Sequence, residues 1–204
     1  MAKTLDTDIE LARWHDHKRG KITVTIEQYQ NLLATQDRTK IADFIYHRLH
    51  SRYLKPFHFE HCQYKEEFKN GFSIMANCCL LIETLQSFKN GWGDSDKKSN
   101  LAFKQFFASE LNFTALKEKA QDFYSNIRCG ILHQGETTGG WRINRNGSNL
   151  FDRTNLIVDS IIFARELDVS LKKYSESLKT ASWDSELWDN FRTKMRKIIS
   201  NCER

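Results

Sequence analysis

The sequence predicts an all-α fold, an antiparallel helical bundle that carries a small β-hairpin insertion. Three observations support this prediction. Apolar residues recur at three- and four-residue steps through most of the chain. The 204 residues include a single proline, and 40% of them are hydrophobic, which is enough to build a sizeable core. One short segment alone shows the turn residues and the β-forming side chains of a pair of strands.

The first helical pattern follows a polar beginning. Residues 1 to about 20 are weakly patterned, and we expect an arm or a short helix there. Thr25 and Gln28 have the spacing of a capping box, which predicts that a helix starts at this point. One face of that helix carries Ile26, Tyr29, Leu32 and Leu33. We therefore take residues 1–38 as an N-terminal arm and a short helix.

Two further helices are predicted before residue 90. The first carries apolar residues from Ile41 to Leu49 and ends before Pro56. The second has the strongest pattern of the chain, runs from about Tyr64 to Phe88 and stops at the following Asn-Gly-Trp-Gly. Its apolar face contains Phe68, Phe72, Met75, Cys79, Ile82 and Leu85. These helices begin the bundle proper, which we assign to residues 39–180.

A loop and two helices are expected next. Residues 94–99 read as a solvated loop, and Ser99 could cap a short helix that contains three phenylalanines. Thr114 then begins a longer helix, which carries Arg128 and His133 and frays near Gly135. Its apolar positions follow the helical step almost without error: Leu116, Ala120, Phe123, Ile127 and Ile131.

The predicted hairpin covers about residues 140–151. Residues 141–144 and 149–151 have strand character and flank Asn146 and Gly147, a strong signal for a tight turn. A long helix is expected from Asn155, and a last amphipathic helix from about Asp184. We expect residues 181–204 to form a helix that docks on the bundle, because acidic residues at its start disfavour a membrane surface.

Charge and cysteine content indicate which partners and which compartment are expected. The net charge of +5 permits an anionic partner without requiring one. The five cysteines lack zinc-finger spacing, so we expect buried free thiols in a reducing compartment. The N-terminus lacks the apolar stretch of a signal peptide, and no apolar run approaches transmembrane length. The sequence therefore predicts a cytoplasmic protein without a membrane partner.

Arg128 and His133 are the candidate catalytic residues. On a regular helix they would lie about 140° apart around the axis and about 7.5 Å apart along it. Both positions lie beside the centre of the apolar stripe, so both side chains could reach a cleft. A guanidinium group can hold a phosphate bidentately, and an imidazole can move a proton near neutral pH. The spacing alone is weak, and a helical scaffold in which it is coincidental remains an alternative.

The surrounding segments resemble the HEPN superfamily. Residues 123–134, Phe-Tyr-Ser-Asn-Ile-Arg-Cys-Gly-Ile-Leu-His-Gln, are similar to its signature helix, which carries an Arg-x4-6-His motif. Residues 71–85 look like the earlier long helix of these domains, with a glutamate in its apolar face. The order of helices also fits, and the resemblance covers roughly residues 40–180.

This resemblance implies a function and partners. Many HEPN domains are metal-independent endoribonucleases, often toxins or defence and stress effectors, and they are commonly homodimers. By this resemblance Arg128 would bind the scissile phosphate of RNA, and His133 would act as the general acid or base. No cofactor would be needed, and an antitoxin or another partner protein could bind the domain. The alternative is a non-catalytic HEPN module that binds nucleotide, RNA or a protein.

Glu83 and Asn77 are expected to form a supporting polar cluster. A buried carboxylate needs a partner, and Arg128 on a neighbouring helix could supply one. A boundary glutamate that meets water is the equally open alternative. Asn77 lies one and two-thirds turns earlier, and we expect it to point to a similar side.

Three arginines and several histidines complete the candidates. Arg142, Arg145 and Arg153 could line a path for RNA phosphates. Trp141 could stack on a base, although packing over the end of the bundle is the favoured interpretation. Two histidine groups, at residues 15–17 and 58–62, could hold a metal, but neither completes a zinc signature, and we expect no metal site.

Overall fold

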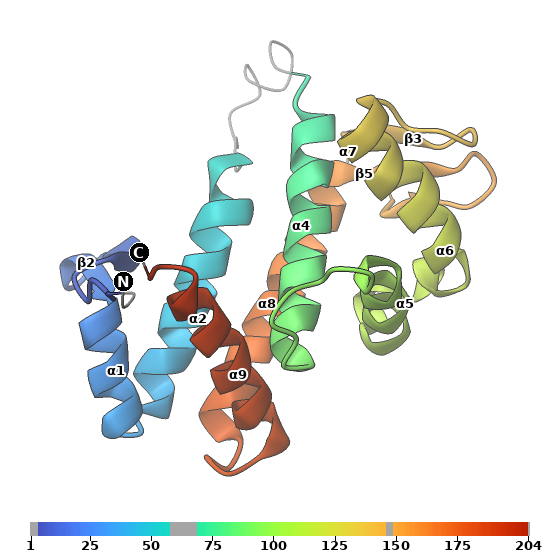
Figure 1. The fold of residues 1–204 in the computed structure, drawn as a ribbon. Helices are drawn as coiled ribbons and strands as arrows, with labels where there is room; N and C mark the ends of the chain where they lie inside the picture. The colour runs from blue at the N-terminus through green and yellow to red at the C-terminus, as the bar shows by residue number, and fades with distance from the viewer. Residues whose placement is uncertain (1–3, 58–68, 146–148, 204) are drawn as a thin grey trace. The chain divides into compact units, whose positions relative to one another are not determined.

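The computed structural model describes residues 4–57, 69–145 and 149–203, and most of them are helical (Figure 1). Contacts divide the chain into two compact units. Unit 1 comprises Met1–Arg52, Ser87–Asp94 and Leu171–Arg204, and unit 2 comprises Tyr53–Gln86 and Ser95–Ser170. This division differs from the expected arm, bundle and docking helix, because residues from both ends of the chain share unit 1.

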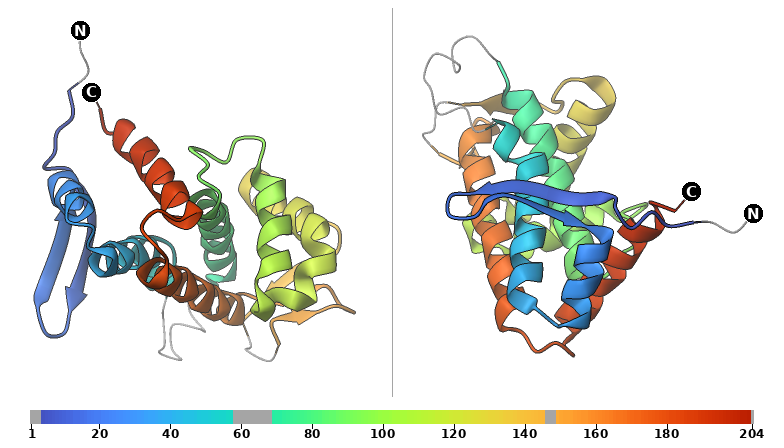
Figure 2. Two further views of the ribbon diagram at one scale, coloured as in Figure 1. Left: turned by 90° about the horizontal axis from the view of Figure 1, so that it is seen from below. Right: turned by 90° about the vertical axis from the view of Figure 1, so that its left-hand side faces the viewer.

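Unit 1 begins with a β-hairpin where an arm or a short helix was expected, so that expectation is wrong. Strands β1 (Glu10–Asp16) and β2 (Gly20–Thr25) pair antiparallel, and β2 leads into the first helix (Figure 2). Trp14 pairs with Ile22 in the hairpin register. An irregularity of the register near the start of β1 interrupts the alternation of side chains, and this hides the strand in the sequence.

The next two helices agree with the sequence. Helix α1 (Ile26–Ala34) begins with the predicted capping box, in which Thr25 and Gln28 exchange two hydrogen bonds of 2.9 and 3.3 Å. Helix α2 (Arg38–Tyr53) ends before a short 3₁₀ turn, η1 (Lys55–Phe57), which contains the only proline of the chain.

The predicted C-terminal helix is confirmed as α9 (Glu186–Ser200). Its apolar face buries Trp188, Phe191 and Met195, and Trp188 Nε1 donates to the carbonyl oxygen of Leu178 at 3.1 Å. These contacts lie within unit 1, so α9 belongs to the core of that unit.

Unit 2 is built around a cluster of phenylalanines. Most of α4 (Gly71–Lys89), all of α5 (Ser99–Ser109) and the first half of α8 (Ser160–Thr180) belong to it. Phe123 stacks on Phe163 with ring centroids 5.5 Å apart. Further rings around them are Phe103, Phe106, Phe107 and Phe113, all buried. The expected start of the α4 pattern, at residues 64–68, lies outside the described residues.

The helix expected from Thr114 is not one regular helix. It comprises the 3₁₀ segment η2 (Leu111–Lys119), α6 (Ala120–Phe123), the π-helical turn η3 (Tyr124–Arg128) and α7 (Cys129–Gln134). The apolar stripe from Leu116 to Ile127 is buried as expected, while Ile131 is only half-buried. Apolar spacing cannot separate these helix types, because it reports the buried face and not the backbone hydrogen bonds.

The predicted β-hairpin at residues 140–151 is wrong in its pairing. Strand β3 (Arg142–Asn144) pairs parallel with β5 (Ile157–Asp159), and β4 (Phe151–Asp152) pairs antiparallel with β5. The strand order is therefore β3-β5-β4. In the central strand β5, Val158 and Asp159 are fully buried. The turn expected at Asn146 and Gly147 lies outside the described residues.

The helix expected from Asn155 starts later in the chain, because residues 157–159 form strand β5. Helix α8 begins at Ser160, after Asp159 Oδ1 accepts hydrogen bonds of 2.9 Å from the amides of Ile161 and Ile162. Asp159 thus caps α8, and the preceding residues are available for the sheet.

Candidate functional site

The segment that carries Arg128 and His133 is held at both ends. Gly135 adopts a left-handed conformation with φ 70° and ends α7. The chain then returns over the helix, where Thr138 donates from its amide and its hydroxyl to Asn126, at 3.0 and 2.9 Å. These contacts tie the segment after α7 back to the π-helical turn.

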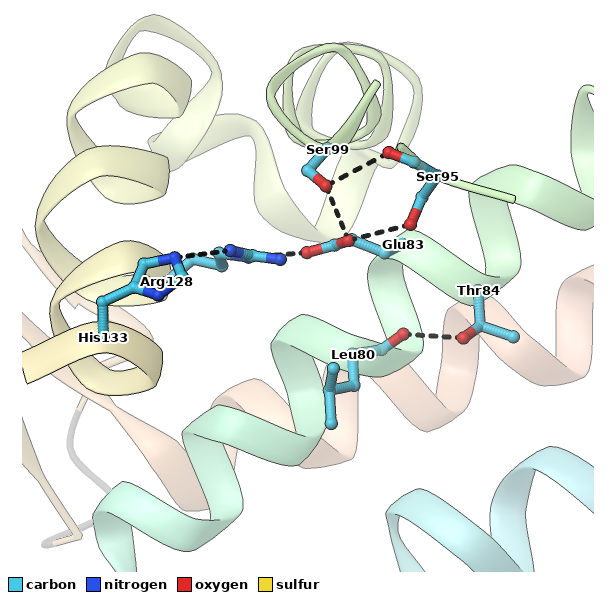
Figure 3. A network of polar contacts seen from close by, with 7 residues as sticks. All are labelled: Leu80, Glu83, Thr84, Ser95, Ser99, Arg128 and His133. Atoms are coloured by element: carbon cyan, nitrogen blue, oxygen red, sulfur yellow. Dashed lines mark hydrogen bonds and ion pairs between the residues drawn. The ribbon is translucent and has the colours of Figure 1, made fainter. Parts of the chain in front are cut away.

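Arg128 forms an ion pair with Glu83. The Nε atom of Arg128 lies 2.7 Å from Oε1 of Glu83, and the two side chains are 16% and 7% exposed (Figure 3). Of the two interpretations left open for Glu83, the structure contains the pair with arginine. The pair joins α4 to the π-helical turn and sets the direction of the guanidinium group.

Two serines are further partners of Glu83. Ser99 Oγ donates to Glu83 Oε2 at 2.8 Å, and Ser95 Oγ donates to the same oxygen at 3.2 Å (Figure 3). The sequence interpretation missed this role. Ser99 was expected to cap α5, but Lys98 occupies the cap position and makes no side-chain cap bond. The sequence holds no signal for this role, because Glu83 is 12 and 16 residues away from the two serines.

His133 lies on the opposite side of Arg128 from Glu83 (Figure 3). Its Nε2 atom is 3.4 Å from Nη1 of Arg128, and the side chain is exposed. Because a guanidinium group only donates, a hydrogen bond at this contact requires the tautomer in which Nε2 carries no proton. The pair therefore presents a fixed cation beside an imidazole whose Nε2 atom is directed at Nη1.

The surroundings of Arg128 favour its charged form. Burial lowers the pKa of Arg128, but the hydrogen bond and the charge of Glu83 outweigh it, so the pKa is raised. The ring of Tyr124 lies beneath the guanidinium group, 5.7 Å from Cζ. Burial, followed by the neighbouring Cys129 thiol, raises the pKa of Tyr124. Arg128 thus stays a cation and Tyr124 a neutral phenol.

A polar cleft of about 490 Å³ adjoins Arg128. The segment between α4 and α5 forms part of its wall, although this segment was expected to be only a solvated loop. Within it Lys97 is held in a left-handed conformation with φ 56°, which is uncommon for a residue with a side chain. The lining residues are Glu83, Ser95, Asp96, Lys97, Ser99, Asn100, Tyr124 and Arg128.

Asn77 does not belong to the polar cluster, so that expectation is wrong. Its amide nitrogen donates to the carbonyl oxygen of Ser73 at 2.8 Å, on its own helix. One and two-thirds turns place it about 120° around the axis from Glu83 and about 9 Å along it. The two side chains consequently leave α4 in different directions.

The three arginines expected on an RNA path have protein partners. Arg142 donates to the carbonyl oxygen of Asn155 at 3.5 Å, and Arg145 donates to Asn70 Oδ1 at 2.5 Å. Arg153 forms an exposed ion pair of 2.8 Å with Glu118. Such a surface pair is weak and can open for a phosphate. Their use by RNA stays a prediction.

Trp141 packs inside unit 2, as favoured from the sequence. It is 3% exposed and stacks on Phe151, with ring centroids 5.2 Å apart. The edge of its ring system also meets Phe123. Trp141 therefore covers the core and is not placed to stack on a base.

The described ranges contain free thiols but no metal-binding cluster. No group of three or more His, Cys, Asp or Glu side chains there could hold a metal ion. The second histidine group, at residues 58–62, lies outside the described residues. Cys78 and Cys79 are buried free thiols, and burial raises the pKa of both. No helix in the described part of the chain has the length and apolarity to cross a membrane.

Comparisons of the chain with protein-family models, with curated proteins and with solved structures found no match.

Proposed function

We propose that this protein is a metal-independent endoribonuclease of the HEPN type, with Arg128 and His133 as its catalytic residues. The observation that carries the proposal is the contact of 3.4 Å between Arg128 Nη1 and the exposed His133 ring. A fixed guanidinium group and a titratable imidazole are the two groups that cleavage at a ribose 2′-hydroxyl needs.

In the proposed reaction Arg128 binds the scissile phosphate through its Nη groups while Glu83 holds the Nε edge. When the phosphate takes over Nη1 of Arg128, the lone pair of His133 Nε2 is freed, and it accepts the proton of the 2′-hydroxyl. The 2′-oxygen then attacks the phosphorus atom. The bond from phosphorus to the 5′-oxygen breaks, this oxygen takes up a proton from water, and His133 later returns its proton to the solvent. The products are a 2′,3′-cyclic phosphate and a free 5′-hydroxyl end. The arginine charge stabilises the negative charge that develops on the phosphate.

Glu83 is a positioning residue in this proposal. It orients the guanidinium group from the side opposite His133, and Ser95 and Ser99 in turn hold its carboxylate. Arg142, Arg145 and Arg153 would bind flanking phosphates and would make RNA affinity fall as salt rises.

The HEPN resemblance also suggests partners. A second copy of this chain would place two Arg128–His133 pairs near one substrate, so that one histidine could act as base and the other as acid. An antitoxin or another partner protein would control such a dimer, and the protein would act as a toxin or as a defence and stress effector. Sedimentation of the purified chain should then show a dimer.

A second candidate function has its own supporting observation. The polar cleft is lined by Arg128 and Lys97, but His133 does not line it. A non-catalytic module that binds a nucleotide, RNA or a protein would use this cleft and would not need the histidine.

The test of the proposed function is cleavage of single-stranded and structured RNA by the full chain in the presence of EDTA. We expect products with cyclic-phosphate ends. His133→Ala should abolish cleavage and leave the helical circular dichroism spectrum unchanged, because His133 is exposed. Arg128→Lys keeps the charge but loses the forked donor geometry, and it should also abolish cleavage.

His15→Ala is the matched control, since His15 is an exposed histidine of the N-terminal hairpin. It should cleave as the unchanged protein does. Cleavage that survives in His133→Ala would contradict the assigned mechanism. Absence of cleavage together with nucleotide binding, weakened by Lys97→Ala but not by His133→Ala, would establish the second candidate instead.

A further inference from the structure

The N-terminal hairpin of unit 1 carries three cations at its turn. Lys18, Arg19 and Lys21 occupy three of the four positions from 18 to 21, and all three side chains are exposed. Among the described residues, no acidic side chain forms an ion pair with any of them. Asp16 Oδ1 accepts hydrogen bonds from the amides of Lys18 and Arg19, both at 2.9 Å. The turn therefore has a defined backbone and a net positive charge.

The inner face of the hairpin is anchored on α2. Trp14 stacks on His47 of α2, with ring centroids 4.5 Å apart and planes 9° from parallel. Arg48 of α2 donates to the carbonyl oxygen of Leu11, and the Leu11 side chain is buried. In the right-hand view of Figure 2 the hairpin crosses α2, and no described segment of unit 1 lies in front of it. The hairpin is therefore held from one side and open to solvent on the other.

The outer face of the hairpin is polar. Trp14 and Ile22 pair with each other and lie on the inner face, so the neighbouring pairs lie on the outer face. These outer pairs are Arg13 with Thr23 and His15 with Lys21. The ion pair with Glu10 neutralises Arg13, and His15 is formally neutral at pH 7. Lys21 consequently supplies the charge of this face, which continues into the cationic turn.

We propose that Lys18, Arg19 and Lys21 bind the phosphate backbone of double-stranded RNA. A duplex has the phosphates of two strands and hence more charge per unit length than a single strand. Surfaces that bind single strands add aromatic side chains for base stacking, but Trp14 of the hairpin stacks on His47 instead. An amphipathic membrane surface adds apolar side chains, and the outer pairs contain none.

The choice of RNA among polyanions rests on the proposed ribonuclease function, and the hairpin would add structured RNA as the class of substrate. Phosphate contacts position a nucleic acid and do not read its bases, so binding should not depend on base sequence. Each contact with a duplex gives a slope of about −0.9 in a plot of log affinity against log salt concentration. Three contacts would therefore contribute about −2.7 to this slope.

The test uses a mixed-sequence RNA duplex of about 20 base pairs, long enough for a typical duplex-binding domain. Its riboses are 2′-O-methylated, so it lacks the attacking hydroxyl and stays intact. Fluorescence anisotropy measures its affinity for the full chain between about 50 and 200 mM salt. A triple variant with Lys18→Gln, Arg19→Gln and Lys21→Gln should bind at least about tenfold more weakly at the lower salt concentration, with a slope shallower by about two to three.

The matched control removes three exposed lysines outside the hairpin, by Lys104→Gln, Lys117→Gln and Lys173→Gln. It has the same change of net charge, and its affinity should fall by less than about threefold, since charges beyond a Debye length are screened. An equal loss in both triple variants would mean that only net charge matters and would overturn the proposal. Unchanged duplex affinity in the hairpin variant would also overturn it.

Two further probes separate other ligands of the turn. A single strand of the same chemistry should bind more weakly, with a slope of about −0.7 per contact. A loss that the hairpin variant shows for the single strand and not for the duplex would overturn the assignment to double-stranded RNA. Vesicles of phosphatidylserine and phosphatidylcholine test a membrane. Vesicle binding that the hairpin variant loses, with unchanged duplex affinity, would assign the turn to a membrane surface instead.

Neither misfolding nor failure of the ribonuclease proposal can imitate these results. The hairpin variant should keep the melting temperature of the unchanged chain, because the three side chains are exposed. His133→Ala should bind the duplex as the unchanged chain does. Duplex binding through the hairpin in a chain that cleaves no RNA would support this contact and contradict only the ribonuclease. Cleavage of RNA with duplex binding that does not depend on the hairpin would contradict only the present proposal.

Discussion

Glu83 in unit 2 and Tyr29 in unit 1 are both buried polar side chains on helices, and their surroundings differ in one respect. Glu83 receives hydrogen bonds from Arg128, Ser95 and Ser99. The hydroxyl of Tyr29 receives and donates none within the described residues. Glu83 stabilises the contacts around it, whereas the enclosed hydroxyl of Tyr29 adds an unfavourable contribution to folding. A buried polar group with partners therefore contributes to stability, and one without partners opposes it.

Arg128→Ala should cause the largest loss of stability, because it leaves the Glu83 carboxylate buried without its charge partner. We expect about 3–5 kcal/mol, the usual cost of breaking a buried ion pair from one side. Urea unfolding at neutral pH would measure it. His133→Ala should change stability by less than about 0.5 kcal/mol, because the histidine is exposed. Similar stability of the two variants would show that the Glu83 pair contributes little.

Ser99→Ala should cause the second-largest loss of stability, about 1.5–3 kcal/mol, as expected for a hydrogen bond to a charged group. Ser95→Ala should cost less, about 1 kcal/mol, since its bond to the same oxygen is longer, at 3.2 against 2.8 Å. Urea unfolding of the two single variants gives the order directly. The reverse order would mean that Ser99 acts mainly elsewhere.

High pH should increase the difference in stability between Tyr29→Phe and the unchanged chain. Burial raises the pKa of Tyr29, although Arg192 and Arg196 oppose this rise. The folded chain therefore keeps a proton that the unfolded chain releases near pH 10, and stability falls as pH rises above that value. At pH 11 this linkage costs the unchanged chain about 1.4 kcal/mol that Tyr29→Phe does not lose.

The measurement is the difference in unfolding free energy between Tyr29→Phe and the unchanged chain at pH 8 and at pH 11. Burial, followed by the charge of Tyr29, raises the pKa of Tyr174. Tyr174 is present in both chains, so only its smaller interaction with Tyr29 enters the difference. A difference that does not grow with pH would mean that the Tyr29 hydroxyl is solvated in the folded chain.

Among the substitutions of buried residues, the smallest effect is expected for Tyr29→Phe at neutral pH. Removing a buried hydroxyl without a partner should be neutral or stabilising by up to about 1 kcal/mol, in contrast to every substitution around Glu83. A loss of more than about 1 kcal/mol in thermal unfolding would indicate a hydrogen bond of the hydroxyl that the comparison with Glu83 leaves out.

The sequence predicted the helices better than it predicted the site. Capping residues and apolar steps located α1, α2 and α9 because these signals are local. The N-terminal hairpin was missed because its few buried positions do not alternate regularly, and β5 was missed because a three-residue strand has no period to detect. The sequence indicated the Arg128–Glu83 pair as one of two interpretations of Glu83. It did not indicate the role of Ser95 and Ser99, because their partner is distant in the sequence and any surface loop contains such residues.

The glycine at position 130 is a stricter requirement on the sequence of this segment than the spacing between Arg128 and His133. A Cβ atom at this position would lie 2.4 Å from the carbonyl oxygen of Glu136, which is backbone and cannot move aside easily. Any chain that folds the segment from Arg128 to His133 in this way must keep a glycine two residues after the arginine. The pattern Arg-x-Gly-x-x-His should therefore find relatives of this protein among newly sequenced genomes with far fewer chance matches than Arg-x4-His.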